Sequence, residues 1–235
     1  MRYDLPDRAG CSGQGLTSPT ELFVWFSPSF PVGGFAYSQG LETAVAYGWI
    51  KNRQSLTEWV AALLRHGGVW NDLVLIALIL RAREEEIFHL CELSSALQPC
   101  RERYDEAMIQ GRNFCEAYRA GWAREDSLLV RLQTLAEITL PIAVGLAARD
   151  YAIALRPTLE GYAVAWLNAQ LASAMRLGVI GQFDGQAITA IMMAEIRSTV
   201  GRAAIATEED LGTAAFGADL AAMLHETLST RLFRS

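Results

Sequence analysis

The stretch from residue 27 to residue 42, SPSFPVGGFAYSQGLE, constrains the fold of this chain more than any other. Proline fixes φ and has no N–H donor, so Ser27-Pro28 and Phe30-Pro31 cannot lie inside a helix. The pair Gly33-Gly34 permits backbone angles that other residues avoid. From Phe35 onward, residues recur at a spacing of three to four, as on one face of a helix. We therefore expect a rigid elbow at residues 27–42 that leads into a helix.

The remaining sequence predicts helices and no strands. Ser18-Pro19 is a typical helix start, and Ser55 to Glu58 form a capping box for a further helix. The apolar run from Leu73 to Leu80 continues into a charged stretch of high helix propensity, which favours a buried helix over a strand. No segment alternates apolar and polar residues between turns, as a strand requires. We expect an all-α, single-domain bundle of about ten helices at residues 18–224, with a flexible N-terminal tail at residues 1–17.

Charge and hydropathy exclude two classes of partner. A net charge of −6 and a pI near 5.2 argue against nonspecific nucleic-acid binding, which depends on a basic surface. The longest apolar run falls well short of the ~20 residues that span a bilayer, and the first residues lack the apolar core of a secretory signal. The four cysteines show no zinc-site spacing and read as reduced thiols. We therefore expect a cytoplasmic protein with neither a nucleic-acid nor a membrane partner.

No catalytic motif is apparent. The one lysine, Lys51, is followed by asparagine, so the chain cannot carry a phosphate-binding P-loop. None of the three histidines has a second histidine at metal-ligand spacing, and each is expected to be a surface or satisfied core residue. Charged pairs such as Arg103 with Glu106 are expected on a solvated helix face. The chain is thus predicted not to be an enzyme, and an enzyme built around a helical cavity has no acid, base or metal site to support it.

Two further segments have unusual composition. Residues 177–186 place Gln182 and Gln186 among three glycines between long helices, which fits either an interhelical loop or a polar pocket. The C-terminal residues 225–235 carry Leu232 and Phe233 between Arg231 and Arg234. Because chain ends are usually polar, this composition predicts a tail that orders when it docks on a partner and whose deletion leaves the fold intact.

Three segments resemble the UreF family of urease accessory proteins, in the same order as in that family. The elbow resembles the family's N-terminal signature, residues 147–186 resemble its central portion, and the run from His225 to Leu232 is similar to its C-terminal ending. The resemblance implies an all-helical, dimeric, non-enzymatic protein. It also implies that the protein binds UreD (also called UreH), recruits the GTPase UreG, and acts with them on the urease apoprotein to install nickel.

The resemblance further implies where partners bind. By resemblance, the partner-binding residues in the elbow are Pro31, Gly33, Phe35 and Ser38. Gln182 is a further one, and those in the tail are Arg231, Leu232 and Phe233. In this interpretation the tail faces UreD, the elbow lies near UreG and the dimer axis, and Gln182 lines a path for nickel. The complex handles nickel, so no resident metal or cofactor is expected. An alternative is a GTPase-activating regulator that supplies an arginine to UreG in trans.

Overall fold

Helices form all the regular secondary structure of the computed structural model, which describes residues 19–235. No strand occurs in that range, which confirms the predicted all-α fold. The predicted N-terminal tail at residues 1–17 lies outside the described residues. The α-helices are α1 (Thr20–Trp25), α2 (Leu41–Ala46), α3 (Arg53–His66), α4 (Gly68–Arg81), α5 (Ile87–Ala96), α6 (Arg101–Gly121), α7 (Leu128–Leu132), α8 (Leu140–Asp150), α9 (Leu155–Arg176), α10 (Gln182–Ala203) and α11 (Phe216–His225). Single 3-10 turns are η1 (Gly34–Ala36), η2 (Glu84–Glu86) and η3 (Glu208–Asp210).

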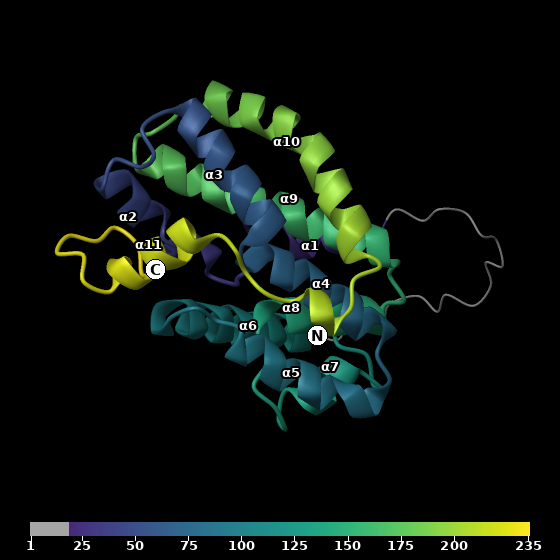
Figure 1. Ribbon diagram of the computed structural model, residues 1–235. Coiled ribbons are helices and arrows are strands. Elements are labelled where there is room, and N and C mark those ends of the chain that lie inside the picture. Colours follow the sequence, from purple (N-terminus) through teal and green to yellow (C-terminus); the bar gives the residue numbers. More distant parts are fainter. Residues whose placement is uncertain (1–18) are drawn as a thin grey trace.

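Helix α4 is the centre of the bundle. It packs against α8 on one side and against α3 and α9 on the other, so it lies between a lower layer of α5 to α8 and an upper layer of α3, α9 and α10 (Figure 1). Most of its side chains are buried, as the apolar run at Leu73–Leu80 predicted. Gly145 of α8 allows the closest approach, because a Cβ there would lie 2.8 Å from Ile79. The buried helix therefore forms where it was expected, although it begins earlier, at Gly68.

Two predicted helix ends were wrong by a few residues. The N-cap of α3 is Asn52, whose Oδ1 accepts the Ser55 N–H at 3.0 Å while the Ser55 hydroxyl accepts the Asn52 N–H at 3.2 Å. Ser55 is thus the second partner of the capping box, since asparagine caps as well as serine. The charged stretch after Leu80 does not continue α4, because Ala82 is extended and its carbonyl accepts a hydrogen bond from Arg149 at 2.7 Å.

Residues 53–81 are long and apolar enough to pass a composition test for a membrane span. They form two helices, α3 and α4, interrupted at Gly67, and 61% of the most apolar window is buried inside the bundle. Core helices of soluble proteins have the same composition, so we assign this stretch to the core.

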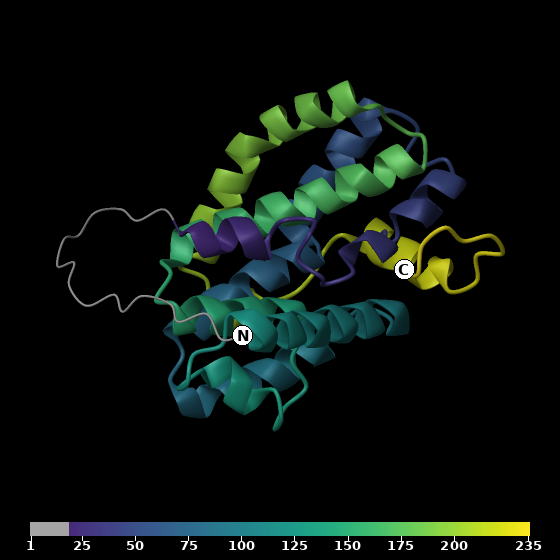
Figure 2. The same cartoon turned by 180° about the vertical axis from the view of Figure 1, so that it is seen from behind.

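Helices α2 and α11, the elbow and the tail meet at one end of the bundle (Figure 2). Gly40 makes this contact possible: its φ of 82° is open to glycine, and a Cβ would lie 2.8 Å from the backbone nitrogen of Ala222 in α11. Phe30 anchors the elbow, because it is buried and its ring lies 5.1 Å from that of Phe114 in α6. The sequence therefore brings its N-terminal elbow and its last residues onto one surface.

Candidate protein-docking site

Main-chain hydrogen bonds join the tail to the elbow. The Arg234 N–H donates to the Ala36 carbonyl at 2.8 Å, and the N–H groups of Ser38 and Gln39 donate to the main-chain oxygen of Ser235 at 2.7 and 3.1 Å. The Ser38 hydroxyl donates to the same oxygen at 2.6 Å and is fully buried. The tail is thus ordered against the elbow within a single chain, whereas the sequence predicted that it orders on a partner.

Glu42 of α2 accepts hydrogen bonds from the main chain of the tail. Its carboxylate accepts the Leu232 N–H at 2.6 Å and the Phe233 N–H at 3.0 Å, and lies 3.0 Å from Nε2 of His225. The other ring nitrogen of His225 lies 2.6 Å from a carboxylate oxygen of Glu102 in α6. His225 is fully buried, so it is the satisfied core histidine that the sequence predicted. The ring connects α2, α6 and the tail.

Glu106 of α6 is a second buried acceptor. It accepts from the amide of Gln39 at 2.9 Å, from Gln110 at 3.0 Å and from the Ser235 hydroxyl at 2.6 Å, and it forms an ion pair with Arg103. The side chains of Arg103 and Glu106 are only 14% and 3% exposed, so the predicted solvated face was wrong. The cause is tertiary, because this polar face of α6 is covered by the elbow and tail.

Gln39 connects Glu106 of α6 to α9 through a network of side-chain hydrogen bonds. Its φ of 57° is unusual for a residue other than glycine, and such strain costs on the order of 1 kcal/mol or more. The side-chain oxygen accepts from Trp166 Nε1 at 2.9 Å and from Gln170 at 3.1 Å, while its amide donates to Glu106. These bonds hold the strained backbone in place, so the network fixes the shape of the elbow.

The elbow, the tail and α6 line an open groove of about 300 Å³. Two apolar side chains at its edge are well exposed, Phe35 at 78% and Leu232 at 55%. Arg176, at the end of α9, donates to the Phe35 carbonyl and stacks over the buried Phe233 ring at 4.2 Å. The lining residues are Gly33, Phe35, Ala36, Tyr37, Ile109, Asn113, Arg176, Leu232 and Arg234. Exposed apolar side chains together with tyrosine and arginine fit a protein-docking surface, because interfaces are enriched in aromatic residues and arginine.

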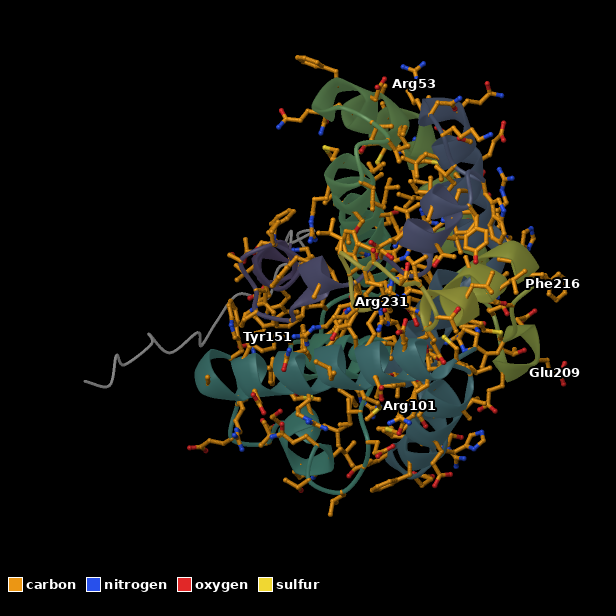
Figure 3. The ribbon with its side chains drawn as sticks, turned by 90° about the vertical axis from the view of Figure 1, so that its left-hand side faces the viewer. Arg53, Arg101, Tyr151, Glu209, Phe216 and Arg231 are labelled. Atoms are coloured by element: carbon orange, nitrogen blue, oxygen red, sulfur yellow. The ribbon has the colours of Figure 1, made fainter. Side chains whose placement is uncertain are left out.

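The predicted partner-binding residues fall into four groups. Gly33, Phe35 and Leu232 line the groove, and Pro31 is exposed in the same elbow. Ser38 and Phe233 face inward and support it. Arg231 forms an ion pair with Glu102 at 2.7 Å, and Figure 3 shows it between the elbow and α11. Gln182 is exposed at the first turn of α10 and is not part of the groove lining.

Comparison with known proteins identifies the family. The family model UreF matches residues 50–193. The chain belongs to the UreF family. The urease accessory protein UreF of Rhizobium etli (strain CIAT 652) is 42% identical over 222 residues, covering 94% of this chain and 97% of the relative. Those of Agrobacterium fabrum (41% identical, 94% and 98% covered) and Bradyrhizobium diazoefficiens (39% identical, 91% and 90% covered) are also similar.

A small cavity lies beside the network of this UreF-family chain. Its volume is about 40 Å³, room for one or two water molecules and too little for a metabolite. Among its lining residues are Gln39, Arg103 and Asp72. Tyr162 donates to Asp72 at 2.8 Å, and removal from water raises the pKa of the Asp72 carboxyl to about 6. Asp72 is therefore a group that takes up a proton readily inside the fold.

The described residues contain no group of three His, Cys, Asp or Glu side chains placed to hold a metal ion. Glu42 and Glu102 do flank His225, but they contact opposite nitrogens of the ring, so the three do not converge on one point. Burial raises the pKa of the Cys91 thiol to about 11 and that of Cys115 to about 12, which keeps both protonated. That the chain has no resident metal or cofactor stays a prediction.

Sequence reasoning missed most of the polar residues that build the groove. Glu42 stands within the elbow signature, but nothing in its neighbours indicates that it accepts bonds from a segment 190 residues away. Glu106 belongs to a helix with a polar composition, which concealed its burial. Arg234 was visible as the second arginine of the tail, whereas no local pattern distinguishes Arg176 from an ordinary last-turn arginine.

Proposed function

We propose that this chain is a nickel-insertion chaperone, which bridges UreD (UreH) and the GTPase UreG in the complex that assembles the nickel centre of urease. Membership of the UreF family supports a role in urease maturation. The groove formed by the elbow and the tail is the observation that supports docking of a partner protein. In this proposal the protein acts in the cytoplasm as a scaffold and not as an enzyme. Nickel is cargo of the complex, and the urease apoprotein is its final acceptor.

Bridging requires separate surfaces for the two partners. We assign the groove, with Phe35 and Leu232 at its rim, to UreG, which moves tail residue Leu232 from the UreD side, where the resemblance put it, to the UreG side, because it lines one groove with the elbow. We assign the outer face of α11 to UreD, because Phe216, Leu220 and Met223 are spaced for one helix face and are 77%, 49% and 47% exposed. Helix α11 ends at His225, where the tail with Arg231 begins.

A third apolar face supports a homodimer in the complex. The outward side of α10 presents Phe183, which is 94% exposed, and Ile191, which is 58% exposed, together with the exposed Ala190 and Ala194. Small and apolar residues on one helix face suit close packing against the same face of a second copy. Gln182 is the first residue of the same helix. A Phe183→Asp variant should therefore lower the mass measured by light scattering for the assembled complex to that of a single set of subunits.

Co-purification with tagged UreD and UreG tests the assignment of surfaces. Phe35→Asp combined with Leu232→Asp should abolish recovery of UreG and retain UreD, because charges in the groove oppose apolar contact. Phe216→Asp combined with Leu220→Asp should do the reverse. Leu135→Asp is the matched control, since this residue is 68% exposed and lies outside both surfaces. Retention of both partners by both double variants would contradict the assignment.

GTPase activation is the second candidate, because Arg234 is exposed within the groove and its side chain forms no ion pair among residues 19–235. An arginine of this kind can stabilise the charge of phosphoryl transfer when it enters a partner's site. Arg234→Ala separates the two roles through UreG binding and GTP turnover measured together. A scaffold loses binding before rate, whereas an activator loses turnover while binding persists.

A further inference from the structure

The groove differs in charge from the rest of the molecule. Its lining includes two arginines, Arg176 and Arg234, and no aspartate or glutamate. Neither guanidinium forms an ion pair with a described residue. By contrast, Arg65 and Arg103, which lie outside the groove lining, each form an ion pair with a glutamate. A chain with a net charge of −6 thus keeps two uncompensated positive charges in one depression.

Both arginines are held in position by the contact between elbow and tail. Arg176 lies over the Phe233 ring and donates one N–H to the Phe35 carbonyl, which orients the plane of its guanidinium. Arg234 is anchored through its main-chain bond to Ala36. Guanidinium groups bind carboxylates with two parallel hydrogen bonds, and pre-orientation lowers the entropy that such binding loses.

The neighbouring side chains add an apolar requirement. Phe35 and Leu232 are exposed at the rim, and the partly buried Ile109 lies in the lining. We infer that the groove binds an acidic segment of a partner protein, in which carboxylates flank an apolar or aromatic side chain. The inference rests on the proposed function for the identity of the partner, but the chemistry of the groove supports it independently.

A labelled copolymer of glutamate and tyrosine is a direct probe, because it offers carboxylates beside aromatic rings and contains no urease protein. Fluorescence anisotropy with the purified full chain should show saturable binding that weakens as salt increases. Arg176→Gln combined with Arg234→Gln should weaken binding about tenfold or more. Arg197→Gln, which removes an exposed arginine of α10, should leave the affinity unchanged.

Arg234→Gln alone keeps the test informative if the double variant unfolds, because the main-chain bond from Arg234 to Ala36 is unchanged and glutamine can still donate to the neighbouring Tyr37. This variant should fold normally by circular dichroism and still weaken binding. Absence of saturable binding, or equal affinity for wild type and Arg234→Gln, would overturn the inference. Competition by inorganic polyphosphate at equal charge would also overturn it, since that result indicates a phosphate site. A chain that binds the copolymer but not UreG would refute the proposed function and leave this inference standing.

Discussion

Glu42 decides at the scale of one residue whether the tail stays on the bundle. It accepts two main-chain N–H groups of the tail and contacts buried His225, so Glu42→Ala leaves two buried polar groups and one partly buried N–H without this partner. Such losses cost on the order of 3 kcal/mol. We expect the free energy of unfolding, measured in urea, to fall by about that amount. Glu116→Ala, an exposed glutamate of α6, is the control, and an equal small effect of both variants would show that Glu42 does not hold the tail.

Asp72 gives the fold a pH dependence whose sign is fixed by its environment. Burial raises the pKa of its carboxyl from 3.8 to about 6, so the folded state binds this proton more tightly than the unfolded state. Its stabilising contribution is complete below pH about 4 and is lost as the pH rises through about 6. Asp72→Asn removes the ionisation, so the variant should gain roughly 1 to 3 kcal/mol relative to wild type between pH about 4 and about 7. A stability difference that does not change with pH would contradict this account.

Adjacent tail residues have opposite roles at the scale of the element. Phe233 is buried under Arg176, whereas Leu232 is 55% exposed. Phe233→Ala should lower the free energy of unfolding by about 3 kcal/mol, and Leu232→Ala by less than about 1 kcal/mol. Chemical denaturation of the two variants makes the comparison directly. Equal losses would mean that the tail does not pack as described.

The same burial changes the expectation for the whole tail. The sequence predicted that deletion of residues 225–235 leaves the fold intact. In the structure the deletion removes His225 and Phe233 and leaves Glu42 and Glu106 without several donors. We therefore expect the thermal midpoint to fall, because buried carboxylates without partners are unfavourable.

Local signals predicted the helices well and the contacts between them poorly. The apolar run at Leu73–Leu80 was enough to identify the core helix, because burial on most sides needs a continuous apolar surface. The polar face of α6 looked solvated, since composition does not show that the elbow and tail cover it. The resemblance named Phe35 and Leu232 as partner-binding residues, and their exposure comes from the structure. The buried acceptors below them depend on contacts between segments far apart in the sequence.

The whole molecule is a helical support for three exposed apolar surfaces: the groove, the α11 face and the α10 face. One end of the bundle assembles the groove from segments nearly 200 residues apart, and the buried network makes the elbow and tail a single unit (Figure 2). Exposed apolar surfaces of this kind suit a protein that positions other proteins, because a bound partner removes their side chains from water. The central claim is therefore that this chain is required for nickel to reach urease.

The nickel content of purified urease tests that claim most directly. Urease apoprotein, UreD and UreG are produced together in cells without this chain, with the wild-type chain, or with the Phe35→Asp, Leu232→Asp variant. Metal analysis should find nickel-loaded urease only with the wild-type chain, and nickel-poor urease in the other two cases. Fully loaded urease from cells that lack the chain would contradict the account.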